Sequence, residues 1–147
     1  MARYHATVET ERSPQEVFAY LSDFSTTKEW DPGVREAARI GRRTGQGAEF
    51  ALVATFLGRD TQLTYTVIEY DPPRAVTFLA DNDSVVSRDR ITFEPVGTGT
   101  RVSYDAVLTL KGLMRVADPL LAIAFKRVGD RALEGMTRAL SDEGRTR

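Results

Sequence analysis

The stretch SPQEVFAYLSDFSTTKEWDPGV, residues 13–34, predicts a short helix, a corner and a second short helix. Ser13 can accept hydrogen bonds from the first turn, Pro14 suits the first helical position, and Glu16 completes a capping box. The apolar residues that follow fall on one side of a helix of only two to three turns. Such a helix is too short to be stable alone in water, so it must pack against another element.

The second helix is predicted to end at Trp30, the chain's single tryptophan. Ser25 or Thr26 can cap a turn that runs to Trp30, and Pro32 prevents Asp31 from continuing it. The chain therefore changes direction directly after its most bulky side chain.

The composition limits the classes of partner that the protein can have. Its 147 residues include 20 Lys plus Arg and 21 Asp plus Glu, which gives a formal net charge of −1. This balance lacks the concentrated positive field of a nucleic-acid binder, so we expect no nucleic-acid partner. The absence of cysteine excludes disulfides and cysteine-ligated zinc. No apolar run approaches the ~20 residues that cross a bilayer, and the first residues lack a signal peptide, so we expect a cytoplasmic protein without stable membrane insertion.

The middle of the chain is predicted to be a series of strands. Apolar and polar residues alternate at 3–10, before the helix pair, and strand-like runs follow it. These runs cover residues 34–40, 48–57, 60–70, 75–80, 85–94 and 100–110. Short turn segments separate them, and because parallel neighbours would need a long crossover, usually a helix, we expect consecutive antiparallel strands.

The last part of the chain changes to a helical repeat. From Leu113 onward the apolar residues fit a period of 3.6, and Asp118-Pro119 suit the cap and first position of a helix. We therefore predict a short turn at 112–117 and a long amphipathic helix at 119–142. A single domain over 1–142 is expected, with a frayed tail at 143–147.

This order of elements resembles the helix-grip fold shared by START-like lipid-transfer domains, the birch-pollen allergen family and the polyketide cyclase/dehydrase family. The segments that carry the resemblance are SPQEVFAYLSDFSTTKEW with its following DP, YTVIEYDPPRAVTF at 65–78, ITFEPVGTGTRVSY at 91–104 and KGLMRVADPLLAIAFKRV at 111–128. It covers nearly the whole chain. The resemblance implies an α+β fold in which a curved, seven-stranded antiparallel sheet wraps around a long C-terminal helix, with two short helices after the first strand. The superfamily hosts carriers, receptors and cyclases, so the resemblance implies a fold and not one chemistry.

In helix-grip proteins the sheet and helices enclose a hollow, so the resemblance implies a cavity lined by inward-facing side chains. Alternation along the strands and the helix period select the residues that face it. Ordinary core packing is the alternative for most of them. The candidate ligand-binding residues are Trp30, Phe50, Leu52, Phe56, Leu63, Tyr65, Val67, Phe78, Asp89, Tyr104, Leu121 and Phe125.

Some of these candidates have specific alternative roles. Trp30 either closes the mouth of the cavity or plugs the end of the sheet as a packing residue. Asp89 and Glu69 are both predicted on inward faces, where an unpaired carboxylate is costly, so each must lie at the rim, find a partner or meet a ligand. Tyr65 and Tyr104 either offer a phenol to a ligand or lie in the core with a water partner.

The sequence gives little support for reaction chemistry. His5, the single histidine, falls on the outward face of the first strand and is expected at the surface, so a Ser-His-Asp triad is not expected. The segment DNDS at 81–84 lacks the rest of a calcium loop, and one histidine without cysteine offers no other metal site, so we expect no metal. No phosphate-loop or dinucleotide motif is present, and we expect no cofactor.

Three functions follow from these observations. The leading hypothesis is the binding or transport of a small hydrophobic molecule, a lipid, isoprenoid or polyketide-like ring system, in a cavity between the sheet and the C-terminal helix. The resemblance alone suggests the first alternative, a polyketide cyclase or aromatase that holds reacting carbons together. The second is a regulatory protein-interaction module that acts through the basic loop Arg42-Arg43 and the tail at 143–147. The pattern does not specify an oligomeric state.

Overall fold

The computed structural model describes residues 1–56, 58–112 and 118–142, with the side chains of 56, 118–121 and 142 excepted. Its strands are β1 (Ala2–Thr10), β2 (Val34–Ile40), β3 (Glu49–Phe56), β4 (Arg59–Asp71), β5 (Ala75–Asp81), β6 (Val85–Val96) and β7 (Gly99–Leu110). Its helices are α1 (Pro14–Leu21), the 3-10 turn η1 (Phe24–Thr26), α2 (Thr27–Trp30) and α3 (Asp118–Asp142). These bounds confirm each predicted strand and the long helix to within two residues at either end. Apart from Gly112, the turn predicted at 112–117 lies outside the described residues, as does the tail at 143–147.

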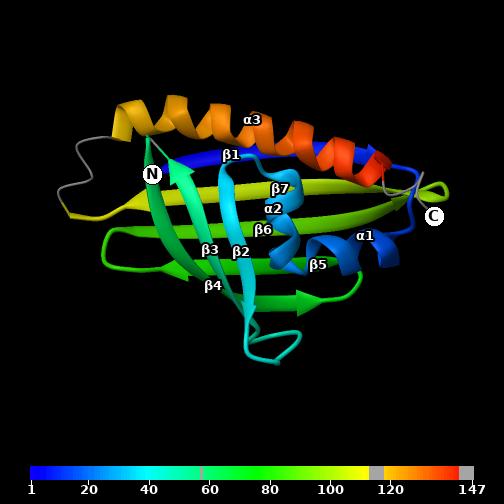
Figure 1. Ribbon diagram of the computed structural model, residues 1–147. Coiled ribbons are helices and arrows are strands. Elements are labelled where there is room, and N and C mark those ends of the chain that lie inside the picture. The colour runs from blue at the N-terminus through cyan, green and yellow to red at the C-terminus, as the bar shows by residue number, and fades with distance from the viewer. Residues whose placement is uncertain (57, 113–117, 143–147) are drawn as a thin grey trace.

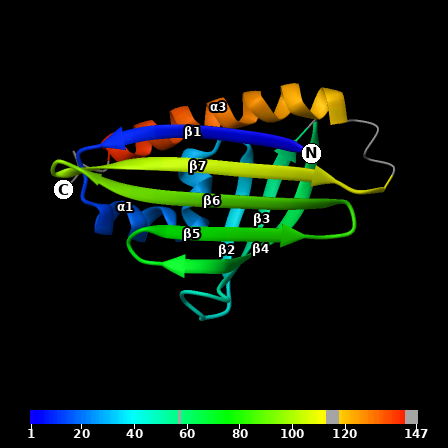
Figure 2. The same cartoon turned by 180° about the vertical axis from the view of Figure 1, so that it is seen from behind.

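The strands form one antiparallel sheet in the order β1-β7-β6-β5-β4-β3-β2. Strands β2 to β7 follow one another as a meander, and β1 adds to β7. The sheet curves strongly, so that β2, β3 and β4 cross at a steep angle to β5, β6 and β7 (Figures 1 and 2). Helix α3 runs along β1 and reaches α2, which gives the predicted α+β helix-grip arrangement. Among the described residues, no helix is long and apolar enough to cross a membrane.

The predicted cap of α1 is present, and the helix packs against one end of the sheet. The Ser13 hydroxyl accepts a hydrogen bond from the Glu16 amide at 3.3 Å. Val17, Phe18 and Leu21 form the buried side of α1. Because α1 contacts β6 and β7 through this side, it fills the end of the sheet that it covers.

The corner after α1 is capped by a residue other than those predicted. The carboxylate of Asp23 accepts hydrogen bonds from the amide and hydroxyl of Ser25, at 3.1 and 2.6 Å, and so begins η1. Thr26 occupies the predicted N-cap position of α2, but its side chain makes no capping hydrogen bond there. Helix α2 ends at Trp30 as predicted, and Asp31 is extended.

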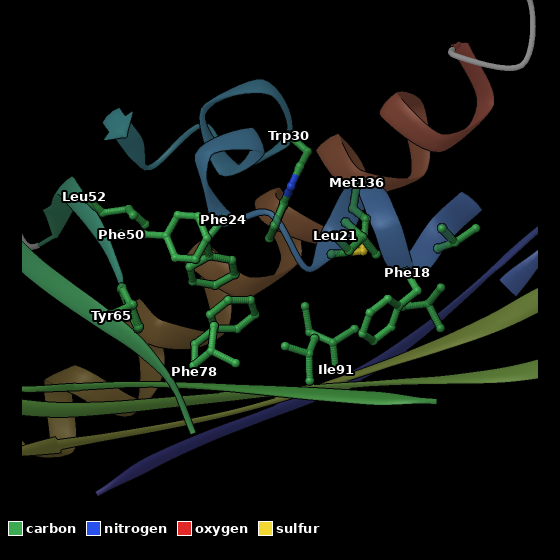
Figure 3. Packing of buried hydrophobic residues seen from close by; sticks show 14 of the residues in the cluster. Phe18, Leu21, Phe24, Trp30, Phe50, Leu52, Tyr65, Phe78, Ile91 and Met136 are labelled. Carbon is green, nitrogen blue, oxygen red and sulfur yellow. The ribbon is translucent and has the colours of Figure 1, made fainter. Parts of the chain in front are cut away.

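Aromatic side chains fill the interior beside α1 and η1. Phe24 of η1 stacks on Phe78 of β5, with ring centroids 3.7 Å apart, and Phe50 lies edge-on to both (Figure 3). Phe18, Leu21, Ile91 and Met136 pack together beside this group, nearer α1 (Figure 3). This half of the interior is therefore filled by side chains of the protein itself.

A β-bulge in β4 overturns one prediction about side-chain direction. The register between β4 and β5 shifts between Val67 and Glu69, so alternation along the strand reverses there. Val67 stays buried, whereas the Glu69 side chain is 41% exposed and pairs with Arg90 at 3.0 Å. The prediction that Glu69 faces inward is therefore wrong.

Candidate functional site

A cavity of about 230 Å³ lies between the concave face of the sheet and α3. Among the described side chains of α3, those that line the cavity are all apolar: Phe125, Val128, Gly129, Ala132, Leu133 and Met136. Strands β3, β4, β6 and β7 supply most of the opposite wall. The volume is somewhat below the ~300 Å³ at which typical small-molecule sites begin, so the cavity fits a compact ligand.

Two of the described residues that line the cavity are exposed to solvent. Arg59 at the start of β4 and Ser84 in the β5–β6 turn both line the cavity and are exposed. The β5–β6 turn lies at the end of the sheet opposite α1 (Figure 1). Of the described lining residues, these two are therefore the most accessible to solvent.

The structure brings seven of the twelve predicted ligand-binding residues to the cavity wall. They are Trp30, Leu52, Leu63, Tyr65, Asp89, Tyr104 and Phe125. Phe50, Val67 and Phe78 do not line the cavity but lie in the core, at most 2% exposed. Phe24, which the sequence did not select, packs against Phe50 and Phe78 and occupies the space beside them. The side chains of Phe56 and Leu121 lie outside the described part of the chain.

Trp30 forms an inner wall of the cavity. It is 2% exposed, and its indole nitrogen donates to the Thr26 hydroxyl at 3.3 Å. The indole also lies edge-on to the ring of Tyr104, with centroids 6.1 Å apart. The indole is therefore shielded from solvent and packs as part of the cavity wall.

A chain of four polar side chains crosses the sheet inside the cavity. The Tyr65 phenol and the Ser87 hydroxyl are 2.8 Å apart, and Ser87 donates to one carboxylate oxygen of Asp89 at 3.3 Å. Tyr104 donates to the other carboxylate oxygen. Ser87 is 5% and Asp89 9% exposed. We call Tyr65, Ser87, Asp89 and Tyr104 the polar cluster.

Burial controls the ionisation of the carboxyl groups that face the cavity. It raises the pKa of Asp89 to about 6, against the opposite effect of the hydrogen bonds from Tyr104 and Ser87. Burial also raises the pKa of Asp31 to about 6, although the Gly33 amide donates to this carboxylate at 2.8 Å. The pKa values of Tyr65 and Tyr104 rise well above the ordinary value because both phenols are buried near Asp89. Near neutral pH the carboxyl groups can therefore ionise while both phenols keep their protons.

Sequence reasoning missed several lining residues, of which Asp31 and Ser87 matter most. Ser87 lies two residues before Asp89 on the same face of β6, so strand alternation alone places it inward. Asp31 follows a helix and precedes a proline, which is typical of a turn residue. Its position at the cavity depends on how α2 docks onto the sheet, and no local pattern encodes that.

Other candidate features lie away from the cavity. The imidazole of His5 contacts the Asp105 carboxylate and is 63% exposed. Within the described residues, no group of three or more His, Cys, Asp or Glu side chains could hold a metal ion. Beside the basic loop, Arg39 of β2 lies 4.7 Å from the Phe50 ring centroid and donates to the Arg43 carbonyl at 2.8 Å. Arg39 therefore fastens this loop to the core.

Comparison with known proteins identifies the family and the fold. Residues 1–141 match the model of the family described as polyketide cyclase / dehydrase and lipid transport. No curated protein sequence matches the chain significantly.

Several solved structures share the fold. A START superfamily protein from Mycobacterium smegmatis has a TM-score of 0.80 at 15% identity, over 97% of this chain and 99% of its own. A protein from Thermus thermophilus gives a TM-score of 0.81 at 17% identity, over 96% and 98%. The di-domain ARO/CYC BexL from the BE-7585A biosynthetic pathway gives 0.71 at 12% identity, over 92% of this chain and 48% of its own. At these identities the likeness concerns the fold alone.

Proposed function

Since this chain belongs to the polyketide cyclase/dehydrase and lipid transport family, we propose that it binds or carries a small, largely apolar molecule in the cavity between the sheet and α3. The observation that carries the proposal is the composition of the cavity wall. One side is wholly apolar, and the buried polar cluster lies on the other. Small-molecule sites commonly combine a mostly apolar lining with a few polar groups that fix the orientation of the ligand.

The energetics favour modest affinity from the apolar contacts alone. Burial of about 300 Å² of ligand surface at ~25 cal/mol/Å² contributes roughly 7.5 kcal/mol before the cost of ordering. This corresponds to binding no tighter than about micromolar. Contacts to the polar cluster would therefore decide which apolar molecules bind well.

Native mass spectrometry of the protein as purified from cells tests this function. We expect a stoichiometric small molecule that survives gentle ionisation and is released into organic solvent for identification. A variant with Ala132→Leu, which narrows the cavity from the apolar wall, should retain less of it. Protein that carries no companion and binds none of a panel of apolar compounds would refute the proposal.

One observation favours a second function, a polyketide cyclase-type enzyme. Asp89 faces the cavity with a pKa of about 6, and a carboxylate of this kind can accept a proton from carbon between two carbonyl groups. Tyr104 beside it keeps its proton at neutral pH. Turnover of a poly-β-ketone substrate, lost in Asp89→Asn and kept in Asp105→Asn on the outer face, would establish this activity. Binding without turnover would leave carriage as the function.

A further inference from the structure

The direction of the hydrogen bonds in the polar cluster shows which of its protons are already used. Tyr104 and Ser87 each donate to Asp89, which accepts at both carboxylate oxygens. Because the Ser87 proton points to Asp89, the Tyr65 phenol must be the donor in its bond to Ser87. All three hydroxyl protons therefore run toward one carboxylate. The polar cluster can therefore still accept hydrogen bonds from a ligand through its free lone pairs.

The other donors of the inner wall are also committed to the protein. The Tyr4 phenol donates to Asp130 at 2.8 Å, and the Thr27 hydroxyl to the Phe24 carbonyl at 2.7 Å. The hydroxyl of Thr55 donates to Asp60 at 2.6 Å. The Trp30 indole and the Gly33 amide are likewise bonded to Thr26 and Asp31. Among the described lining residues, the side-chain donors that remain are Arg59, Thr61 and Ser84, of which Arg59 and Ser84 are exposed.

The buried part of the cavity wall therefore offers a ligand hydrogen-bond acceptors and almost no donors. Asp31 adds a second carboxylate there, with one oxygen held by the Gly33 amide. A polar ligand atom that cannot donate would meet only lone pairs and would lose its hydrogen bonds to water without replacement. A ligand carboxylate would in addition face two groups of like charge.

From this arrangement we infer that the cavity selects apolar molecules whose buried end carries a hydrogen-bond donor, a hydroxyl or a protonated amine, and discriminates against carboxylates and ketones. This inference rests on the proposed function of binding or carriage, since it names the class of ligand for the same cavity, and it counts against the cyclase alternative, whose substrate would be a poly-β-ketone. An alcohol would donate to a single lone pair. A protonated amine would also neutralise charge, so the two ligand classes share one recognition chemistry but differ in their dependence on Asp31.

Protonation of the carboxyl groups would relax this preference. The groups that face Asp89 are Tyr65 from β4, Ser87 from β6, Tyr104 from β7 and Asp31 after α2, and none of the described α3 side chains at the cavity is charged. Below a pH of about 6 the Asp89 carboxyl gains a proton that it can donate. Ketones should therefore bind better at pH 5 than at pH 7.5, whereas protonated amines should bind worse.

A matched probe series tests the inference on the intact protein by isothermal titration calorimetry at pH 7.5. The probes are 2-naphthylmethanol, 2-naphthylmethylamine, 2-acetylnaphthalene, 2-naphthylacetate and 2-methylnaphthalene, with the benzene analogues to remove the effect of size. We expect the alcohol and the amine to bind about tenfold tighter than the ketone, the gain from one hydrogen bond, with the carboxylate weakest. Equal binding of alcohol, ketone and carboxylate would overturn the inference and leave the proposed function standing. No binding by any probe, including 2-methylnaphthalene, would overturn both.

Substitutions separate the donor preference from general affinity. Asp89→Asn replaces an acceptor by an amide and releases one proton of the cluster, so the ketone should gain about tenfold relative to the amine. Asp31→Asn should weaken the amine more than the alcohol. Asp105→Asn makes the same change on the outer face, where Asp105 is 47% exposed beside His5, and should alter nothing. If Asp89→Asn kept the preference for ligands that donate a hydrogen bond, the polar cluster would not be its source. The probe series on the wild-type protein remains a valid test even if a variant fails to fold.

Discussion

Gly135 of α3 lies directly against the main chain of Trp30, so closely that a Cβ atom at position 135 would collide with the Trp30 carbonyl group. Gly129, two turns earlier, lies over the ring of Tyr4, where an added Cβ would be 2.6 Å from ring carbons. Helix α3 therefore meets α2 and β1 at positions that have no side chain. The two contacts hold the middle and the C-terminal half of α3 close to the rest of the protein.

Gly135→Ala is expected to destabilise the fold, although alanine is the better helix former. The obstructing atoms belong to the main chain and cannot rotate away, so α3 must shift, at a cost of about 1–3 kcal/mol or more. In Gly129→Ala the obstructing atoms belong to a side chain that can move, so the loss should be smaller. Urea unfolding of both variants measures the difference. Equal stability of Gly135→Ala and the wild type would show that this contact is not rigid.

The stability of the protein should fall as pH rises from about 4 to about 7. Asp89 and Asp31 each change from an ordinary pKa of 3.8 to about 6 on folding, so the folded state binds more protons than the unfolded state in this window. Each group then lowers the free energy of unfolding by up to about 3 kcal/mol above pH 6. Urea unfolding at several pH values should show this slope, and Asp89→Asn should flatten it. An unaltered slope in the variant would remove Asp89 as its source.

Trp30 should report binding through its fluorescence. The indole is buried at the cavity wall, so its emission should lie at short wavelength and resist quenching by iodide. A saturating apolar ligand that does not itself absorb in this range, such as a cyclohexyl compound, should shift or quench it. The single tryptophan makes the assignment direct. If calorimetry detects binding while the Trp30 emission does not change, the ligand binds outside the cavity.

Phe125→Ala should change ligand preference more than stability, whereas Phe78→Ala should change stability and leave ligand preference as it is. Phe125 is partly exposed and lines the cavity, so its removal should extend preference toward larger ligands at modest cost in stability. Phe78 is fully buried under Phe24, so its truncation should cost about 3–5 kcal/mol. Its ligand preference should stay unchanged. Urea unfolding and a ligand size series measured on both variants would decide, and identical profiles would argue against separate roles.

Local patterns predicted the elements of this fold well because each pattern reports on a single segment. The Ser13 cap and the alternation that turns Asp89 inward both follow from a few neighbouring residues. Glu69 was misjudged because the bulge beside Val67 depends on pairing with β5. Phe24 and Asp31 reach the interior through the docking of η1 and α2, which is a tertiary contact and leaves no period in the sequence.

The same docking of η1 divides the interior into unlike compartments. Beside α1 the aromatic stack of Phe24 and Phe78 leaves no room, whereas under Phe125 and Leu133 space remains. Residues that hold the fold together are thus largely distinct from residues that would meet a ligand. Substitutions in the hollow compartment could therefore change ligand preference, in evolution or in the laboratory. The packed compartment would stay intact and would offset the stability that such substitutions lose.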